Sequence, residues 1–351
     1  MIPTLPKLAW CIALAFATTL FVSSAPAPRA GATSSSASVP LCNRFVAPTG
    51  SDRSRGDRRS PFATVSRLVK GLRAGQTGCL LSGRYKENLW IARGGQPSKP
   101  MTLRAAPGAK ATLCGHVEFK SSADYWRLIR LSVDGSCSSE NTIQIYGDHV
   151  TLGHADITNR HIAHSCVYIG GPRWGRARET VLHHDRIHDC GDNGNRHTHG
   201  IYADSPRNAR ITDNYIYANS GFGIQLYPDA QDTLVEHNVI DGNLTESGLV
   251  FGGEAPYASS HNLVRWNIFS GNGAYGVSSS WAAGVVGAGN VANGNCFWEN
   301  ADGALDRTLL GFRATGNVDA NPLFVDRALR DYRLRRGSRC KLMQPRGHVG
   351  P

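Results

Sequence analysis

Residues 188–227 read HDCGDNGNRHTHGIYADSPRNARITDNYIYANSGFGIQLY and contain two successive passes of one structural repeat. The first pass carries an oversized polar loop, Cys190 to His199, directly before the short run Gly200–Asp204. The second pass carries the same run as Gly223–Tyr227, with almost no loop before it. Because loops on a rigid scaffold commonly carry function, we expect the functional site near this departure from the repeat.

The same repeat continues on both sides of this stretch. Six units share one six-residue pattern, in which the first and last residues are apolar and the fourth is the bend residue. These units begin at Leu128, Leu152, Leu182, Ile211, Val235 and Val264. Their steps of 24, 30, 29, 24 and 29 residues fit neither a propeller blade nor a leucine-rich repeat. Short strands in coils of this length predict an all-β fold, a right-handed single-stranded parallel β-helix whose equivalent residues stack in columns.

Two of these columns lie at the bends. The bend residue of three successive units is an asparagine, and we expect Asn214, Asn238 and Asn267 to hydrogen-bond along the axis. The position before the bend repeats as His154, His184, Asp213 and His237. We interpret this second column as a structural turn ladder, away from the candidate functional face.

The ends of the chain are expected to differ from the repeat. Residues 1–32 combine Lys7, the apolar run Leu8 to Val22 and an A-x-A site ending at Ala32, which predicts a signal peptide; an uncleaved membrane anchor is the alternative. Residues 33–40 predict a flexible leader. Residues 41–75 predict a strand and a capping helix that starts with Ser60 as N-cap and Pro61. Residues 76–351 predict the β-helix with a C-terminal cap.

Cysteine content agrees with export. Removal of the signal would leave eight cysteines, an even number without any C-x-x-C motif, which favours disulfides over zinc sites. Separations of 23 and 24 residues, close to one coil, predict the pairs Cys114–Cys137 and Cys166–Cys190. We further predict the pairs Cys42–Cys79, closing the N-terminal cap, and Cys296–Cys340, tying the last coil to the tail.

The formal net charge of the whole chain is +11, and loss of Lys7 and Arg29 leaves 38 − 2 = 36 basic against 27 acidic residues, or +9. A basic exported protein favours anionic polymers, of which we expect an acidic polysaccharide rather than a nucleic acid. The alternative is a generally basic, soluble surface. After signal removal no segment is long enough to span a membrane, and we expect a secreted monomer.

Three segments of the chain resemble one family. FVAPTGSDRSRGDRRSPFATVSRLVKGLRAGQTGCLLSGRYKEN is similar to the usual opening, NYIYANSGFGIQLY to a generic coil, and ANPLFVDRALRDYRLRRGSRC to the usual closing segment, of the bacterial pectate-lyase-like β-helix superfamily. The resemblance implies the β-helix fold. It leaves the activity open, since this superfamily includes polysaccharide lyases, uronate epimerases, glycoside hydrolases and proteins with no known reaction.

In the resembled family the strand after the variable turn faces the substrate. Here that strand carries Tyr168, Tyr202 and Gln225 in one outward column, and Asp204 and Tyr227 in the next. Aromatic and amide side chains in neighbouring columns suit a sugar chain, although tyrosine stripes also occur as ordinary sheet surface. The bordering loops supply Arg173, Trp174, Arg176 and Arg207, whose guanidinium groups could pair with substrate carboxylates or be solvated loop charges.

His197, His199 and Tyr202 are the candidate catalytic residues. Proton abstraction beside a uronate carboxylate needs a base and a stabilising partner, and His199 or Tyr202 could be the base or the acid. A structural role for the loop histidines stays open, and so does metal binding, although two histidines are too few for a site. Calcium is a candidate cofactor without an identifiable ligand set. A hydrolase would need two carboxylates, for which Asp192, Asp204 and Asp229 are available but not paired by any pattern.

The sequence therefore predicts a secreted carbohydrate-active protein, a polysaccharide lyase or uronate epimerase acting on an acidic polysaccharide. The alternative from another class is a non-catalytic carbohydrate-binding or adhesion β-helix. An inverting glycoside hydrolase ranks behind both.

Overall fold

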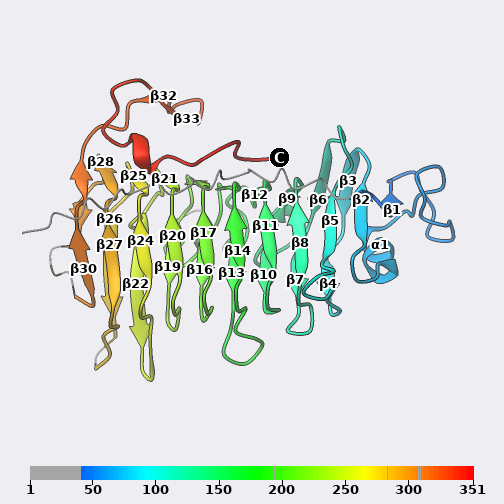
Figure 1. The fold of residues 1–351 in the computed structure, drawn as a ribbon, viewed down its shortest axis with the longest axis horizontal. Coiled ribbons are helices and arrows are strands. Elements are labelled where there is room, and N and C mark those ends of the chain that lie inside the picture. Colours follow the sequence, from blue (N-terminus) through cyan, green and yellow to red (C-terminus); the bar gives the residue numbers. More distant parts are fainter. Residues whose placement is uncertain (1–40, 193, 283, 307, 309) are drawn as a thin grey trace, which may run out of the picture. The chain divides into compact units, whose positions relative to one another are not determined.

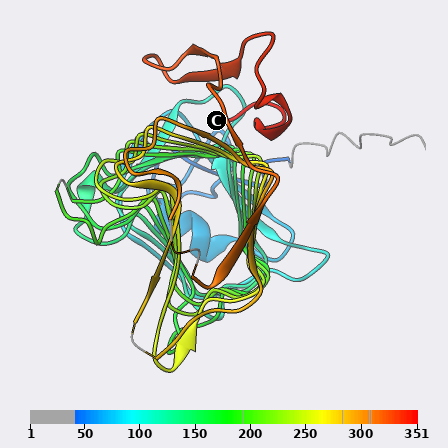
Figure 2. The ribbon, with the colours of Figure 1, turned by 90° about the vertical axis from the view of Figure 1, so that its left-hand side faces the viewer.

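The computed structural model describes residues 41–192, 194–282, 284–306, 308 and 310–351. The predicted signal peptide and leader, residues 1–40, lie outside the described residues. Residues from position 41 onward form a parallel β-solenoid, as the sequence predicted, with the strands of successive coils side by side (Figure 1). Figure 2, which looks along the axis of the coils, shows three sheets enclosing one core.

The three sheets of the described coils each contribute one strand per turn. Sheet A contains β1 (Arg44–Val46), β2 (Thr77–Leu80), β5 (Met101–Ala105), β8 (Trp126–Ile129), β11 (Thr151–Gly153), β14 (Val181–His183), β17 (Arg210–Thr212), β20 (Leu234–Glu236), β24 (Leu263–Arg265), β27 (Asn290–Asn293) and β30 (Phe312–Thr315). Sheet B contains β3 (Gly83–Lys86), β6 (Ala111–Cys114), β9 (Ser132–Asp134), β12 (Asp156–Thr158), β15 (Arg186–His188), β18 (Tyr215–Tyr217), β21 (Val239–Asp241), β25 (Ile268–Ser270), β28 (Cys296–Trp298) and β31 (Val318–Asp319). Sheet C contains β4 (Leu89–Ile91), β7 (Val117–Phe119), β10 (Ile143–Ile145), β13 (Val167–Ile169), β16 (Ile201–Ala203), β19 (Ile224–Leu226), β22 (Leu249–Glu254), β26 (Tyr275–Trp281) and β29 (Gly303–Leu305), with β23 (Tyr257–Ala258) antiparallel to β22.

Strand alternation fills the core. In β13, Val167 and Ile169 point inward and are fully buried, whereas Tyr168 between them points outward. The next coil repeats this arrangement in β16, whose Tyr202 pairs in register with Tyr168. Burying one such aliphatic side chain contributes about 1.5–3 kcal/mol to the stability of the fold. A one-residue slip in strand register would turn a whole column of these side chains outward and lose this contribution from each of them.

One α-helix in the described residues, α1 (Val65–Gly71), covers the first coil and buries Val65, Leu68 and Val69 against it. The prediction that this helix starts at Ser60 and Pro61 is wrong, because Thr64 is the N-cap. Phe62 pairs with Val46 as a short β-bridge, which extends the backbone ahead of the helix. The carboxylate of Glu87 accepts hydrogen bonds from the backbone N–H groups of Val65 and Ser66 and so caps the helix.

Near the C-terminal end of the solenoid, the antiparallel hairpin of β32 (Phe324–Asp326) and β33 (Asp331–Leu334) lies outside the coils, against sheet B (Figures 1 and 2). Two short 3-10 turns also occur, η1 (Gly135–Cys137) and η2 (Lys341–Met343). The hairpin docks on the fully buried Asp241 of β21, whose carboxylate accepts hydrogen bonds from Tyr332 Oη at 2.9 Å and Arg327 Nε at 2.8 Å.

All four predicted cysteine pairs are formed. Their Cα–Cα distances are 5.7 Å for Cys42–Cys79, 5.4 Å for Cys114–Cys137, 5.4 Å for Cys166–Cys190 and 5.6 Å for Cys296–Cys340. No helix in the part of the chain that the structure describes is both long and apolar enough to cross a membrane.

The predicted asparagine column is a continuous amide ladder inside the bend between sheets A and B. Asn214 Nδ2 donates to Asn238 Oδ1 at 2.9 Å, and Asn238 Nδ2 donates to Asn267 Oδ1 at 2.9 Å. The ladder continues to Asn295 and Asn317, and a second ladder runs through Asn219, Asn243, Asn272 and Asn300. Because each amide also bonds to backbone groups, buried polar atoms fix one coil against the next.

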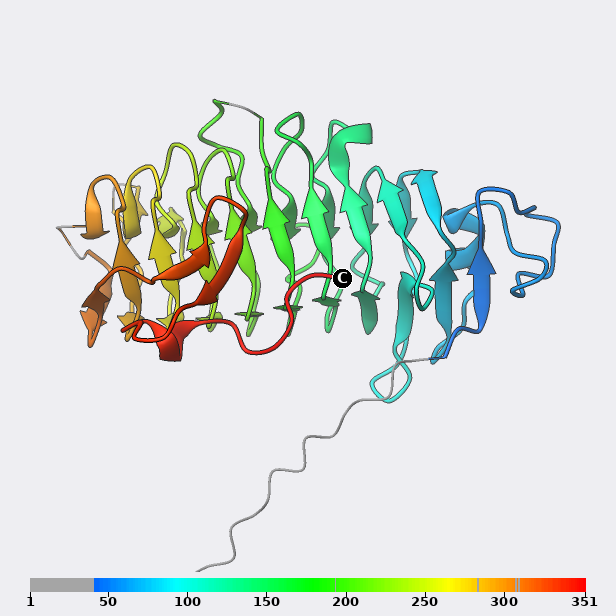
Figure 3. The same ribbon diagram turned by 90° about the horizontal axis from the view of Figure 1, so that it is seen from above.

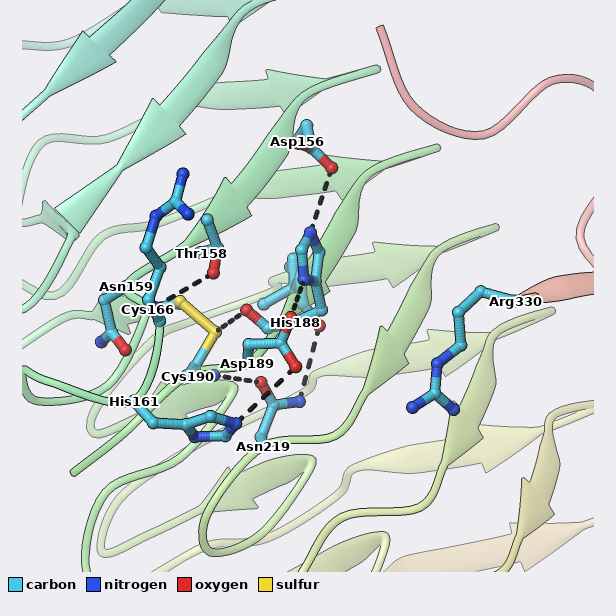
Figure 4. Close-up of polar contacts among 12 residues, drawn as sticks. Asp156, Thr158, Asn159, His161, Cys166, His188, Asp189, Cys190, Asn219 and Arg330 are labelled. Atoms are coloured by element: carbon cyan, nitrogen blue, oxygen red, sulfur yellow. Dashed lines mark hydrogen bonds and ion pairs between the residues drawn. A yellow bond between two sulfur atoms is a disulfide. The ribbon is translucent and has the colours of Figure 1, made fainter. Parts of the chain in front are cut away.

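A second link between coils is ionic and lies on sheet B. His188 on β15 contacts Asp156 on β12 through Nε2 at 3.2 Å and Asp189 through Nδ1 at 2.8 Å (Figure 4). Its ring stacks on Tyr217 of the following coil, with ring centroids 4.8 Å apart. Burial alone would lower the pKa of His188, but the hydrogen bonds that its ring donates to the two carboxylates outweigh this effect and raise the pKa to about 9.

The first prediction concerns the head of the amide ladder, where Asp185 occupies the position of Asn214. Asp185 Oδ1 accepts the N–H of Ala155 at 2.7 Å, but Oδ2 is buried and has no partner among the described residues. Burial raises the pKa of this carboxyl well above its ordinary value of 3.8. Because the unfolded chain releases this proton more readily than the folded chain, the free energy of unfolding falls as pH rises above 3.8. Asp185→Asn should therefore raise the free energy of unfolding by about 1–2 kcal/mol at neutral pH.

Urea denaturation of the Asp185→Asn variant at pH 4 and pH 8 measures this effect, and the gain should be larger at the higher pH. Asp185→Ala is the matched control, because it removes the acceptor for the Ala155 N–H and should destabilise the fold. An asparagine variant that is less stable than the natural chain would contradict the assignment.

The second prediction concerns pH dependence. Since the pKa of His188 is raised from 6.5 to about 9, its stabilising charge is fully present below pH 6.5 and is lost as pH rises through about 9. His188→Gln should lower the free energy of unfolding by about 1–2 kcal/mol at pH 6, a modest value because both carboxylates are partly exposed. The difference between the two proteins should shrink by pH 10 in denaturation experiments. A difference that stays constant across this range would mean that the histidine acts by packing alone.

Candidate functional site

The long loop that interrupts the repeat is anchored at its first residue. Cys190, fully buried, is bonded to Cys166, which lies directly before β13 (Figure 4). The next residue, Gly191, donates its N–H to Asn159 Oδ1 at 3.1 Å. The loop then closes on itself, because Thr198 Oγ1 accepts the N–H of Asp192 at 2.9 Å. Position 193 lies outside the described residues.

The end of the loop packs directly on the backbone of the next coil at Gly221. A Cβ atom added to Gly221 would lie 2.6 Å from His199 Nδ1 and 2.7 Å from the carbonyl oxygen of Arg196. The N–H of Gly221 donates to the carbonyl of Thr198 at 2.8 Å. A glycine is therefore needed here for the loop to close.

His199 is fixed in one orientation at the start of β16. Its side chain is buried, its backbone N–H donates to Ser165 Oγ at 2.8 Å, and its Nδ1 accepts the backbone N–H of Phe222 at 3.1 Å. The hydrogen of the neutral ring must therefore be on Nε2. Burial, reinforced by the neighbouring His197, lowers the pKa of His199 to about 3.

His199 is consequently a neutral imidazole that presents an N–H. Of the acid and base roles that the sequence left open for it, this arrangement favours hydrogen-bond donation, because neither ring nitrogen offers a free lone pair.

Tyr202 lies beside His199 in a line of aromatic rings on sheet C. The ring centroid of Tyr202 is 5.8 Å from that of His199 and 5.1 Å from that of Tyr168, both edge-to-face. The line continues from Tyr168 to Tyr146 at 6.1 Å, and from Tyr146 to the exposed Trp174 at 5.8 Å. We call Trp174, Tyr146, Tyr168 and Tyr202 the aromatic track. Burial, and then the charge of Asp204, raises the pKa of the Tyr202 phenol, which keeps it protonated as a donor.

A cleft of about 400 Å³ opens at the His199 end of the aromatic track. It is lined by Arg196, His197, His199, Tyr202, Phe222, Gln225, Tyr227, Val250 and Ser280. Five of these residues were predicted from sequence as site residues, and the described lining contains no carboxylate. The predicted site residues did not include Arg196, Phe222, Val250 and Ser280. Phe222 was identifiable, since it precedes Gly223 as His199 precedes Gly200 one coil earlier.

The loop residues after β13 do not line this cleft. Arg173 and Trp174 are exposed, and Arg173 forms no ion pair with the described residues. Arg176 and Arg207 both bond to Oδ2 of Asp229, and Arg207 Nη2 does so at 2.8 Å. The side chain of Asp229 is only 8% exposed, so these two charges are largely occupied inside the protein.

Asp204 and Asp229 lie on adjacent coils, where the N–H of Asp229 donates to the carbonyl of Asp204 at 2.9 Å, but the carboxylates of both are engaged by other side chains. Asp192 is exposed on the loop, Asp229 is held by the two arginines, and Asp204 Oδ2 accepts the Tyr168 hydroxyl at 2.7 Å. Asp204 Oδ1 is buried without a described partner, and burial raises the pKa of this carboxyl. The hydroxyl of Tyr227 is also committed, since it donates to Glu254 Oε2 at 2.6 Å.

The predicted turn ladder lies on the other side of the molecule, at the corner of sheets A and B. Its members adopt left-handed backbone conformations, with φ of 51° at His154, 58° at His184, 58° at Asp213 and 55° at His237. The C-terminal tail crosses this corner (Figure 3). His184 Nε2 bonds to the carbonyl of Arg346 at 2.5 Å, and the N–H of Arg346 donates to Asp213 Oδ1 at 2.8 Å. Contact with the tail was not predicted.

Comparison with known proteins agrees with this architecture. A family model described as "Right handed beta helix region" matches residues 115–309. The uncharacterised protein YwoF of Bacillus subtilis is 31% identical over 81 residues, which make up 23% of this chain and only 17% of that protein.

Two solved structures share the fold at low identity. Pectate lyase Pel9A is 14% identical with a TM-score of 0.57, over 88% of this chain and 89% of that one. A structure described as a glycoside hydrolase is 9% identical with a TM-score of 0.58, over 78% of this chain and 96% of that one. The repeat, the parallel sheets and the family match together show that the chain belongs to the right-handed β-helix family.

Proposed function

We propose that this protein is a secreted carbohydrate-active enzyme that cleaves or epimerises an acidic polysaccharide at a uronate residue. The observation that carries the proposal is the cleft on sheet C, where the N–H of a neutral His199 and the phenol of Tyr202 converge beside His197. An aromatic track leads into the same place.

Lyases and C5 epimerases of uronates begin with the same step. A base takes the proton at C5, and the electron pair of the C–H bond moves into the adjacent carboxylate as an enolate. In a lyase the C4–O bond then breaks and the departing oxygen takes up a proton, whereas an epimerase returns a proton to C5 from the opposite face. Both reactions need donors at the enolate oxygens, which buried N–H and O–H groups supply well.

The cleft contains groups for each of these tasks. His199 and Tyr202 are placed to donate hydrogen bonds to the carboxylate or to the departing oxygen. His197 is exposed at the edge of the cleft, and we assign it the role of base. The described lining offers no pair of carboxylates, which disfavours the inverting hydrolase.

Substrate binding would use the aromatic track and the basic surface. The track extends across successive coils about 4.8 Å apart, so the exposed ring of Trp174 and the half-buried rings of Tyr168 and Tyr202 can contact sugars of one chain, whereas Tyr146 is buried. The expected mature chain carries +9, from 36 basic and 27 acidic residues, which attracts polyanions. A signal-like N-terminus and four disulfides support an exported protein.

A non-catalytic polysaccharide-binding protein is the second candidate, because the aromatic track alone would suffice for binding. Incubation with a panel of uronate polymers separates the two functions. A lyase produces unsaturated ends with ultraviolet absorbance, and an epimerase changes the NMR spectrum of the polymer without shortening it. Binding without either change would establish the second candidate, and an absence of both binding and turnover across the panel would overturn the proposal.

The third prediction tests the catalytic assignment. Tyr202→Phe should lower turnover by about 10²–10⁴-fold, the usual cost of removing a general acid–base group. His199→Gln should lower turnover by about 10²–10³-fold, the usual cost of removing a hydrogen-bond donor to a developing oxyanion. Gly221→Ala should also lower turnover without removing any functional side chain, because its Cβ would displace the end of the loop. His237→Ala, on the opposite corner, is the control and should retain turnover. Full activity in both the His199 and Tyr202 variants would place the reaction elsewhere.

The fourth prediction separates binding charges from structural ones. Arg173→Gln should weaken polysaccharide binding by roughly twofold to fivefold at low salt and less at high salt, because exposed charges are screened. Arg207→Gln should instead destabilise the fold by about 1–3 kcal/mol, because the buried carboxylate of Asp229 loses a charged donor. Affinity measurements at two salt concentrations and thermal melts of both variants check this. The opposite pattern would show that Arg207 contacts the substrate.

A further inference from the structure

Three histidines meet at the corner of sheets A and B, outside the cleft. His154 and His184 occupy equivalent turns of successive coils, and their rings stack with centroids 4.8 Å apart and 19° between planes. His183 is the last residue of β14, and its Nδ1 lies 3.0 Å from Nδ1 of His184. One ring nitrogen from each histidine can be chosen so that all three lie within 4.8 Å of one another.

The C-terminal tail orients one of the three rings. The carbonyl of Arg346 can only accept a hydrogen bond, so the hydrogen of neutral His184 is on Nε2, and Nδ1 carries the lone pair. The Nδ1 atom of His154 is buried and has no hydrogen-bond partner among the described residues, so it is open to a ligand.

The scaffold makes room for the third ring. A Cβ atom at Gly153 would lie 2.5 Å from Nε2 of His183, so the His183 ring can lie over this position only because the residue is glycine. Without a metal, Nδ1 of His183 donates its hydrogen to Nδ1 of His184. A shift of that hydrogen to Nε2 of His183 frees a third lone pair on the same side.

We propose that His154, His183 and His184 bind one divalent transition-metal ion of the zinc, nickel or copper class. Zn–N bonds of about 2.0–2.1 Å place two ligand nitrogens of one ion about 3.3 Å apart, close to the separation of the His183 and His184 Nδ1 atoms. Three imidazoles favour these ions over calcium or magnesium, which prefer oxygen ligands. The fourth position would be taken by water.

Carbonyl groups that orient metal-binding histidines are the usual outer partners of such a site. Here that partner belongs to the C-terminal tail, at Arg346. The metal would therefore join two coils and stabilise the docking of the tail. This site is independent of the function proposed for the cleft, because it lies on different sheets.

Zinc titration of the untagged full chain against a chromophoric chelator tests the site. The natural chain should bind one zinc ion at this site, and His154→Gln and His183→Gln should each weaken that binding at least tenfold. Gly153→Ala keeps all three histidines but displaces the His183 ring, and it should weaken binding as well. If a histidine variant fails to fold, Gly153→Ala still tests the site, because it leaves all three histidines in place.

His237→Gln is the matched control. His237 belongs to the same turn ladder and its Nδ1 is also buried without a described partner, but it is not among the three clustered histidines. Its loss should leave zinc affinity unchanged. Cobalt should give the intense visible bands of a four-coordinate ion with the natural chain and not with His183→Gln. Zinc affinity that is equal in the natural chain and in His183→Gln, or an absence of stoichiometric binding, would overturn the proposal.

Discussion

The buried amide ladder is the constraint on which the rest of the structure depends. Asn214, Asn238 and Asn267 each donate to or accept from the equivalent residue of the next coil, in a place where water cannot substitute. A slip by one residue would break every rung at once and turn the apolar columns outward. The outward columns inherit the same register, so Tyr168 and Tyr202 are neighbours because the asparagines behind them are paired.

On such a regular scaffold, the long loop can change the surface without disturbing the core. The Cys166–Cys190 disulfide holds its beginning, and the bare backbone of Gly221 receives its end. Between these points the chain places His199 so that a backbone N–H fixes its tautomer and burial keeps it neutral. The opposite corner follows the same principle, since the C-terminal tail fixes the ring of His184. At each of these two places, one histidine ring is therefore oriented by the backbone of another segment.

The sequence predicted whatever follows from periodicity, including the coil register, the amide ladder and the disulfides Cys114–Cys137 and Cys166–Cys190 at one-coil spacing. It also brought His197, His199 and Tyr202 to one face. It could not predict contacts between segments that periodicity does not relate. Asp229 neutralises Arg176 and Arg207 across coils, and the tail crosses the histidine ladder more than 100 residues away. The helix start was misplaced for a similar reason, because the cap from Glu87 comes from a later coil.

The central claim is that an acidic polysaccharide binds along sheet C at the cleft. Hydrogen exchange measured by mass spectrometry, with and without the uronate polymer that binds best, tests this most directly. Peptides covering residues 165–170, 197–204 and 222–228 should exchange more slowly with the polymer bound, and peptides covering the ladder corner at 182–186 and 234–239 should not change. Protection confined to sheets A and B, or no protection by any uronate polymer, would contradict the account.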